Sequence, residues 1–222
     1  MSDWTPRRFR FIAFDWDGTL ADSTGIITEA IRHACADVGE PVPDENAARY
    51  VIGLGLADAL RHVAPGLPAS RHDELTERYR EYYLARDSAI PLFAGVRELL
   101  DELRQAGFLL GVATGKSRRG LERAMDTHGL IDQFVATRCG DEGFPKPHPD
   151  MLLHLIDRVG VAPAETLMIG DTTHDIALAH AAGAACVAVG YGAHAPEQLA
   201  RLGPLATVGS VRELRGWLYA NA

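Results

Sequence analysis

The chain has 222 residues, and 47% of them are hydrophobic, which is enough for a packed domain with a smaller companion and too much for a disordered chain. Acidic residues outnumber basic ones by 30 to 22. We therefore expect neither a nucleic acid nor an anionic membrane as the main partner, because both bind best to clustered Lys and Arg. The apolar run after Arg10 breaks at Asp15, unlike a signal peptide, and no apolar run reaches the roughly 20 residues that span a bilayer. These features predict a cytoplasmic protein.

The cysteines are few, odd in number and far apart in the chain. Cys35, Cys139 and Cys186 show no CxxC spacing. We therefore predict three small buried side chains in a reducing compartment, and neither disulfides nor zinc ligands.

The first predicted element is a strand over residues 9–14, an apolar run rich in Phe and typical of a strand buried on both faces. Residues 15–20 (DWDGTL) follow it directly. This motif is open to two interpretations. It is either a turn, since Asp and Gly are common turn formers, or a cation site, since two adjacent carboxylates after a buried strand are costly unless a cation neutralises them.

Residues 21–88 contain helical patterns and no convincing strand. One apolar stripe is formed by Ile27, Ile31 and Ala34, and a second includes Leu75 and Tyr79. A single crossover helix needs only about a dozen residues. We therefore predict a helical cap domain over residues 21–88, inserted into a core domain made of residues 1–20 and 89–222.

The rest of the chain alternates short apolar runs with helical patterns. Further buried strands are predicted over residues 109–113, 134–137, 166–169 and 186–189. The helical stripes between them are formed by Val96, Leu99, Leu100 and Leu103, and by Leu152, Leu155, Ile156 and Val159. Alternating strands and helices predict an α/β fold with a doubly wound parallel sheet, a Rossmann-like core.

Polar residues follow these strands, at residues 114–117 (TGKS), around Lys146 and at residues 170–175 (GDTTHD). The carboxyl ends of parallel strands form one ligand-binding edge, so we expect these residues to converge there. Each has a simpler interpretation. Thr114 could cap the following helix, Lys146 could be an ordinary solvated lysine, and the acids could be an N-cap and a solvated first-turn residue.

The set as a whole resembles the four ordered motifs of the haloacid dehalogenase-like superfamily. The matching residues are 15–20, Thr114, Lys146, and Gly170-Asp171 with Asp175, and the resemblance spans the chain, including the insert. Thr19, Ala113-Thr114-Gly115-Lys116 and residues 53–56 (GLGL) are similar to the phosphoglycolate-phosphatase-like branch. Trp16 departs from the usual Phe and keeps a bulky aromatic side chain.

The resemblance implies a two-step phosphoryl transfer. Asp15 is the expected nucleophile, forming an aspartyl phosphate, and a carboxylate is already ionised at neutral pH. Asp17 is expected to protonate the leaving alkoxide and then to take a proton from the hydrolytic water. Dehalogenases and phosphonatases of the superfamily lack an acid at that position, so Asp17 favours a phosphatase or a phosphomutase.

The resemblance also implies a metal site and a phosphate site. Mg²⁺ is expected on Asp15, the backbone carbonyl of Asp17 and Asp171, with Asp175 orienting a metal-bound water or supporting the ligands from behind. The expected phosphate-binding residues are Gly18, Thr114, Gly115 and Lys146, of which Lys146 neutralises charge on the phosphoryl group and on Asp15.

These expectations combine into a magnesium-dependent phosphatase acting on a small phosphomonoester such as phosphoglycolate. Two alternatives remain open. A sugar-phosphate mutase of the same fold is disfavoured by Thr19. A non-catalytic phosphate-sensing or partner-binding regulator would be expected to have lost at least one of four residues, and all are present: Asp15, Asp17, Lys146 and Asp171.

Substrate choice is expected to lie in the insert, where Gly53-Leu54-Gly55 could bring backbone close to the substrate. Arg49 and Arg61 are candidates there for binding a carboxylate of the substrate, or else they are ordinary surface arginines. His148 and His174 lie beside site motifs. The alternative is that they have no role in the site, His148 as a loop residue and His174 as a residue at the start of a helix. Three tyrosines of the insert are expected to pack helices and not to line a pocket: Tyr79, Tyr82 and Tyr83.

Overall fold

A parallel sheet lies at the centre of the computed structural model, which describes residues 8–222; residues 1–7, predicted as part of the core, lie outside the described residues. Within this range the sheet has six strands in the order β3-β2-β1-β4-β5-β6, and every neighbouring pair is parallel. The strands are β1 (Phe11–Phe14), β2 (Leu109–Ala113), β3 (Ala136–Arg138), β4 (Thr166–Gly170), β5 (Ala185–Val189) and β6 (Ala206–Val208).

The strands send alternate side chains to two separate apolar cores. Phe11 and Ala13 of β1 join one core, and Ile12 and Phe14 join the other. All four residues are fully buried. Because both faces of β1 are buried, its sequence is a continuous apolar run and does not alternate between apolar and polar residues.

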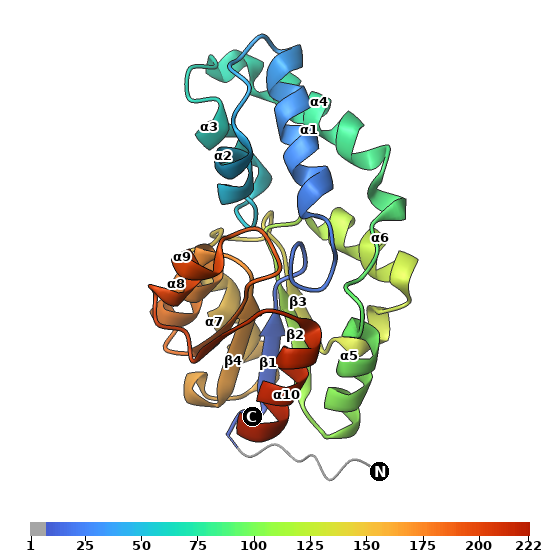
Figure 1. The fold of residues 1–222 in the computed structure, drawn as a ribbon, viewed down its shortest axis with the longest axis vertical. Helices are drawn as coiled ribbons and strands as arrows, with labels where there is room; N and C mark the ends of the chain where they lie inside the picture. Colours follow the sequence, from blue (N-terminus) through green and yellow to red (C-terminus); the bar gives the residue numbers. More distant parts are fainter. Residues whose placement is uncertain (1–7) are drawn as a thin grey trace.

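Helices cover both faces of the sheet (Figure 1). One face packs against α5 (Val96–Gln105), α6 (Arg118–His128) and α10 (Val211–Asn221), and the other against α7 (Asp150–Val159), α8 (Thr173–Ala181) and α9 (Pro196–Ala200). Short 3-10 turns, η3 (Ile131–Gln133) and η4 (Pro163–Glu165), precede β3 and β4. This arrangement confirms the predicted α/β, doubly wound parallel fold.

A group of helices lies beyond the carboxyl ends of the strands, at the top of Figure 1. We call residues 21–88 the cap segment. It contains α1 (Thr24–Asp37), α2 (Glu45–Tyr50), α3 (Leu56–Val63), η1 (Ala69–Arg71) and α4 (His72–Leu84), and it ends within η2 (Asp87–Ala89). Helices α1 and α4 pack side by side through buried apolar residues that include Ile27, Ile31 and Leu75.

The chain enters and leaves the cap segment at one place. Ala21 forms isolated β-bridges with Asp17 on one side and with Leu92 on the other. Asp22 N–H also donates to the carbonyl of Pro91 at 2.9 Å. The two connections are therefore tied together beside the motif that follows β1.

The prediction from the sequence missed one strand and placed the ends of others wrongly. β6 is short and contains a Thr, so it has no apolar run to detect. β1 begins at Phe11, although Phe9 is also fully buried, and β3 is displaced by two residues from the start of the predicted range. Burial sets the apolar pattern, whereas pairing with the neighbouring strand sets where a strand begins.

Cys35, Cys139 and Cys186 are free and buried, as predicted. Among residues 8–222, every helix is too short or too polar to cross a membrane.

Candidate functional site

Three carboxylates gather at the carboxyl ends of β1 and β4. Asp15 follows β1 directly, and Asp171 and Asp175 follow β4, which pairs with β1. One side-chain oxygen from each lies within 4.8 Å of the others, and all three residues are at most 1% exposed. Pairing of the two strands thus brings together acids that lie more than 150 residues apart in the sequence.

Lys146 reaches into this cluster from the loop before α7. Its Nζ lies 3.0 Å from Asp15 Oδ1 and 2.6 Å from Asp175 Oδ1, and its side chain is fully buried. The interpretation as an ordinary solvated lysine is therefore wrong. Burial by itself lowers the pKa of an ammonium group, but the charges of Asp15 and Asp175 outweigh it and raise the pKa of Lys146, which stays cationic.

Asp15 has one engaged oxygen and one free oxygen. Oδ1 accepts the N–H of Trp16 at 2.6 Å and faces Lys146, whereas Oδ2 is buried without a hydrogen-bond partner among residues 8–222. Burial raises the pKa of Asp15 to about 7 against the opposing charge of Lys146, and the charges of Asp175 and Asp17 add to the rise. A buried carboxylate oxygen without a partner is costly, so this atom marks where a ligand would be stabilised.

Asp171 is held by two donors. Thr19 Oγ1 donates to Oδ1 at 2.8 Å, and the N–H of Ala193 donates to Oδ2 at 2.7 Å. A Cβ on Gly18, whose φ is +82°, would overlap Oδ2, and so would a Cβ on Gly192. The backbone thus approaches this carboxylate so closely that only glycine fits. Burial, with the charges of Asp15 and Asp175, raises the pKa of Asp171.

Asp175 belongs to the first turn of α8 but is completely buried. Thr172 caps this helix and donates to Asp175 Oδ2 through its N–H at 3.0 Å and its hydroxyl at 2.7 Å. The N-cap interpretation of Asp171 and the solvated interpretation of Asp175 are therefore both wrong. Both oxygens of Asp175 already have partners, the second being Lys146.

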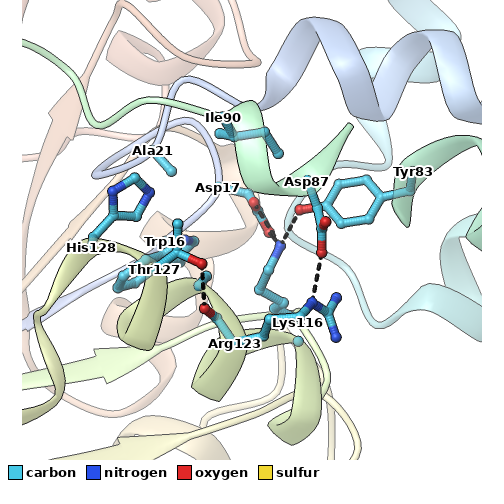
Figure 2. Close-up of a pocket in the computed structure, with 12 residues that line it drawn as sticks. Trp16, Asp17, Ala21, Tyr83, Asp87, Ile90, Lys116, Arg123, Thr127 and His128 are labelled. Carbon is cyan, nitrogen blue, oxygen red and sulfur yellow. Dashed lines mark hydrogen bonds and ion pairs between the residues drawn. The ribbon is translucent and has the colours of Figure 1, made fainter. Parts of the chain in front are cut away.

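The Asp17 carboxylate lies outside this cluster and faces a second lysine (Figure 2). Lys116 Nζ donates to both Asp17 oxygens at 3.0 Å, and Ser23 Oγ donates to Oδ1 at 2.8 Å. Lys116 also donates to the hydroxyl of Tyr83, on α4, at 2.7 Å. The side chain of Asp17 is thus shared between the sheet edge and the cap segment.

The turn after β2 carries Thr114 and Gly115. Thr114 is buried, and its hydroxyl accepts the N–H of Lys116 at 3.2 Å. Ser117, not Thr114, caps α6, so the helix-cap interpretation of Thr114 is wrong. A Cβ on Gly115 would overlap the carbonyl oxygens of Gly53 and Leu54, so the cap segment rests directly on this turn.

The other residues singled out in the sequence lie around the cluster. Arg61 pairs with Asp58 and is half exposed. Arg49 Nη1 donates to the carbonyl of Gly192 at 3.3 Å, and its Nε pairs with Glu45.

Two histidines join the cap segment to the core at Tyr50. His174 Nε2 lies 2.8 Å from the carbonyl oxygen of Tyr50, and His194, which the sequence did not suggest, lies 3.1 Å from it. His148 accepts the N–H of Asp150 and so belongs to the start of α7. None of these hydrogen bonds joins a histidine to one of the three carboxylates within the described chain.

Sequence reasoning missed Lys116 and Tyr83 as site residues. The prediction that Tyr83 only packs helices is wrong, since its hydroxyl meets Lys116, whereas Tyr79 does stack on Tyr83 and Tyr82 on His33. One signal for Lys116 was available. The chain has two lysines, Lys116 and Lys146, and both are buried in this site.

The cluster has the chemistry of a site for a hard divalent cation. Asp15 and Asp171 supply oxygen donors, which Mg²⁺ prefers. Three buried carboxylates meet one ammonium group, that of Lys146, within the described chain, so negative charge is left for a cation to balance. The residues therefore fit such an ion.

Comparison with known proteins was made on both sequence and structure. A family model described as haloacid dehalogenase-like hydrolase matches residues 12–189. The chain is 35% identical over 216 residues to "Probable phosphatase IndB" of Dickeya dadantii, covering 94% of this chain and 93% of that protein. It is 33% identical over 229 residues to the phosphoglycolate phosphatase of Vibrio vulnificus, covering 98% and 100%.

Solved structures agree with the sequence relatives. The crystal structure of a predicted phosphoglycolate phosphatase from Haemophilus somnus superimposes with a TM-score of 0.82 at 27% identity, covering 94% of this chain and 97% of that one. The similarity therefore extends over the sheet, its helices and the cap segment.

Proposed function

The chain belongs to the haloacid dehalogenase-like hydrolases and is a phosphatase, and from this premise we propose that it hydrolyses a small phosphomonoester of the size of phosphoglycolate, using Mg²⁺ and a phosphate ester on Asp15. The main support is the free Oδ2 of Asp15, a buried carboxylate oxygen with no partner in the described chain, beside Lys146. An atom in this setting is available as a nucleophile.

In the first step, Asp15 Oδ2 attacks phosphorus and the bond to the ester oxygen breaks. Asp17 gives its proton to the departing alkoxide, and water then cleaves the aspartyl phosphate while Asp17 takes a proton back. Lys146 balances negative charge on Asp15 and on the phosphoryl oxygens, and Asp175 holds Lys146 in position. The Thr114 hydroxyl and the backbone N–H of Gly115 would donate to the phosphoryl group, whereas the N–H of Gly18, which the sequence also suggested, donates to the carbonyl of Ala21 at 2.9 Å.

Asp15, Asp171 and the backbone carbonyl of Asp17 would hold the metal ion. When bound, Mg²⁺ supplies positive charge that lets two anions approach each other. Thr19 and Ala193 fix the direction of the Asp171 carboxylate through the two hydrogen bonds to its oxygens.

We also propose that residues 21–88 act as a separate cap domain over the site. Gly53 and Leu54 lie against Gly115, and Tyr83 contacts Lys116, so the cap segment has points of contact beside the reacting groups. A closed cap excludes water and admits only leaving groups that fit beneath it.

Phosphate release from p-nitrophenyl phosphate and from a panel of phosphorylated metabolites, with Mg²⁺ or with EDTA, tests this proposal. We expect release that depends on Mg²⁺ and favours small esters. A mutase would instead yield an isomer and need a bisphosphate activator. A phosphate-sensing protein would bind phosphate without turnover, and either result would contradict the proposal.

Replacing Asp17 with Asn is expected to affect substrates unequally. The kcat/KM for alkyl phosphates, whose leaving group needs a proton, should fall by about 10²–10⁴-fold. The kcat/KM for p-nitrophenyl phosphate should fall by less than about tenfold, because nitrophenolate leaves without protonation and kcat/KM does not include the later hydrolysis of the aspartyl phosphate, in which Asp17 acts as a base. The neighbouring exposed Asp22→Asn is the control. Equal losses on both substrates would refute the acid–base role of Asp17.

Magnesium should stabilise the protein more at high pH than at low pH. The folded pKa of Asp15 is about 7, above its ordinary value of 3.8, so the folded state binds more protons than the unfolded state between these values. Without metal, stability therefore falls as the pH rises through this window. Metal binding offsets that loss, because only ionised carboxylates bind the cation.

Thermal unfolding with Mg²⁺ and with EDTA measures this linkage. We expect Mg²⁺ to raise Tm by roughly 5–10 °C near pH 8 and by much less near pH 5. Proton release on adding Mg²⁺ to a weakly buffered solution is the second readout. A Tm increase of the same size at both pH values would count against metal binding by Asp15 and Asp171.

A further inference from the structure

Lys116 has a setting of its own, separate from that of Lys146. Its side chain is 9% exposed, and its ammonium group donates to Asp17 Oδ1, Asp17 Oδ2 and the Tyr83 hydroxyl. It also lies 4.8 Å from the centre of the Tyr83 ring. One partner comes from the sheet edge and the other from the cap segment, so Lys116 links the two parts of the molecule (Figure 2).

We propose that Lys116, with the hydroxyl of Tyr83, binds a carboxylate on the leaving group of the substrate, so that the enzyme selects phosphate esters of small hydroxy acids. This inference rests on the phosphatase function proposed above and assigns a specificity-determining residue to it. The substrate carboxylate would take the place that the Asp17 carboxylate occupies beside Lys116.

The proposed role of Asp17 as the acid places the leaving group of the substrate beside Lys116. Asp17 must reach the ester oxygen to protonate it. Whatever extends beyond that oxygen therefore lies against the neighbours of Asp17, and the cation among them is Lys116, at 3.0 Å. A carboxylate bound there would draw Lys116 away from Asp17, which leaves the Asp17 carboxyl group directed at the ester oxygen.

The space beside Lys116 suits a small leaving group. The cavity that Asp17, Lys116 and Tyr83 line has a volume of about 20 Å³, room for about one water molecule. Trp16 and Ile90 close it with apolar side chains. With the cap segment in this position, the cavity has no room for a sugar or a nucleoside, so only a small extension of the leaving group could lie beside Lys116.

The other candidate cations already pair with protein groups. Arg123 Nε donates to Asp87 at 2.6 Å and thereby joins α6 to η2. Arg49 and Arg61, which the sequence suggested as carboxylate readers, pair with Glu45 and Asp58. Lys116 is the cation that contacts both the proposed acid and the cap segment.

A pair of matched substrates separates this role from a merely structural one. 2-Phosphoglycolate and ethyl phosphate have leaving groups of two carbons, and they differ by a carboxylate in place of a methyl group. We expect the wild-type enzyme to prefer 2-phosphoglycolate. In Lys116→Met, the ratio of the two kcat/KM values should fall by about 30–100-fold, with a raised KM for 2-phosphoglycolate, because a charged hydrogen-bond partner is lost.

Two further variants refine the kinetic test. Lys116→Arg keeps the charge and should recover part of the preference, and Tyr83→Phe should lower the ratio by about 3–10-fold through the loss of one hydrogen bond. If Lys116→Met lowers both kcat/KM values by the same factor, Lys116 serves only to hold Asp17 and the inference is overturned. If the wild-type enzyme releases phosphate from neither ester nor from p-nitrophenyl phosphate, the proposed function itself fails.

Direct binding gives a readout that does not depend on turnover. Because the chain has two lysines, protein labelled with ¹³C at lysine Cε has two lysine Cε signals, which Lys116→Met assigns. Titration of wild-type protein with glycolate in the presence of Mg²⁺ should shift the Lys116 signal, whereas ethanol should not. A shift confined to Lys146, or no shift at saturating glycolate, would overturn the proposal.

Discussion

Asp15→Asn should abolish phosphate release from every ester, by at least about 10⁴-fold, while the protein remains folded. An amide oxygen is a far weaker nucleophile than a carboxylate, and here the free Oδ2 is the atom proposed to attack phosphorus. The change also removes one negative charge from a cluster of three buried acids. Stability without metal should therefore be unchanged or higher, because less charge is buried.

Steady-state kinetics and thermal unfolding check both halves of this prediction. The exposed Asp132→Asn is a matched control that makes the same chemical change far from the cluster. Wild-type protein incubated with substrate and quenched in acid should carry phosphate on Asp15, detectable by mass spectrometry, and Asp15→Asn should not. Appreciable turnover by Asp15→Asn, with no contaminating phosphatase, would rule out Asp15 as the nucleophile.

Lys146→Met should damage both activity and stability. The variant keeps most of the side-chain volume but removes the cation that separates Asp15 from Asp175. Removing one partner of a buried ion pair costs about 3–5 kcal/mol of unfolding free energy. Activity should fall by about 10³-fold on every substrate, since the lost charge acts on the phosphoryl group and not on the leaving group.

The stability loss should depend on pH and on Asp175. Protonation relieves the uncompensated acids, so denaturant unfolding should show a smaller loss near pH 5 than near pH 8. In a double-mutant cycle with Asp175→Asn, the two changes should cost less together than the sum of their separate costs.

Lys116→Met is the matched control for activity, because it removes the other buried lysine. It should change the preference among substrates, whereas Lys146→Met should lower all rates alike. A Lys146→Met variant with normal turnover would contradict the role proposed for this residue.

The sheet and the carboxylate cluster were predictable because local patterns determine them. Continuous apolar runs mark strands buried on both faces, and in a parallel sheet the residues that follow neighbouring strands must lie at one edge. Asp15 and Asp171 therefore had to be close once β1 and β4 were adjacent. The burial of Lys146 did not follow from its own neighbours in the sequence, but from the two acids it meets.

The contacts between the cap segment and the core were not predictable in the same way. Tyr83 lies on α4 among residues typical of helix packing, and nothing near it in the sequence indicates that its hydroxyl reaches Lys116. The same holds for the Asp17 side chain, which faces Lys116 instead of the carboxylate cluster. Such contacts join residues far apart in the sequence, and the periodicity of apolar residues within each helix does not encode them.

The burial of both lysines gives the molecule a chemical reporter of its own motion. Reagents that acylate or methylate lysine amines need the side chain in water, and Lys146 is fully enclosed while Lys116 lies under Tyr83. With twenty of the 22 basic residues being arginine, the surface offers such reagents no competing lysine. If the cap segment opens as proposed, the rate at which Lys116 reacts would measure how often it moves away from the sheet edge, and a ligand that holds the cap segment in place would slow the reaction.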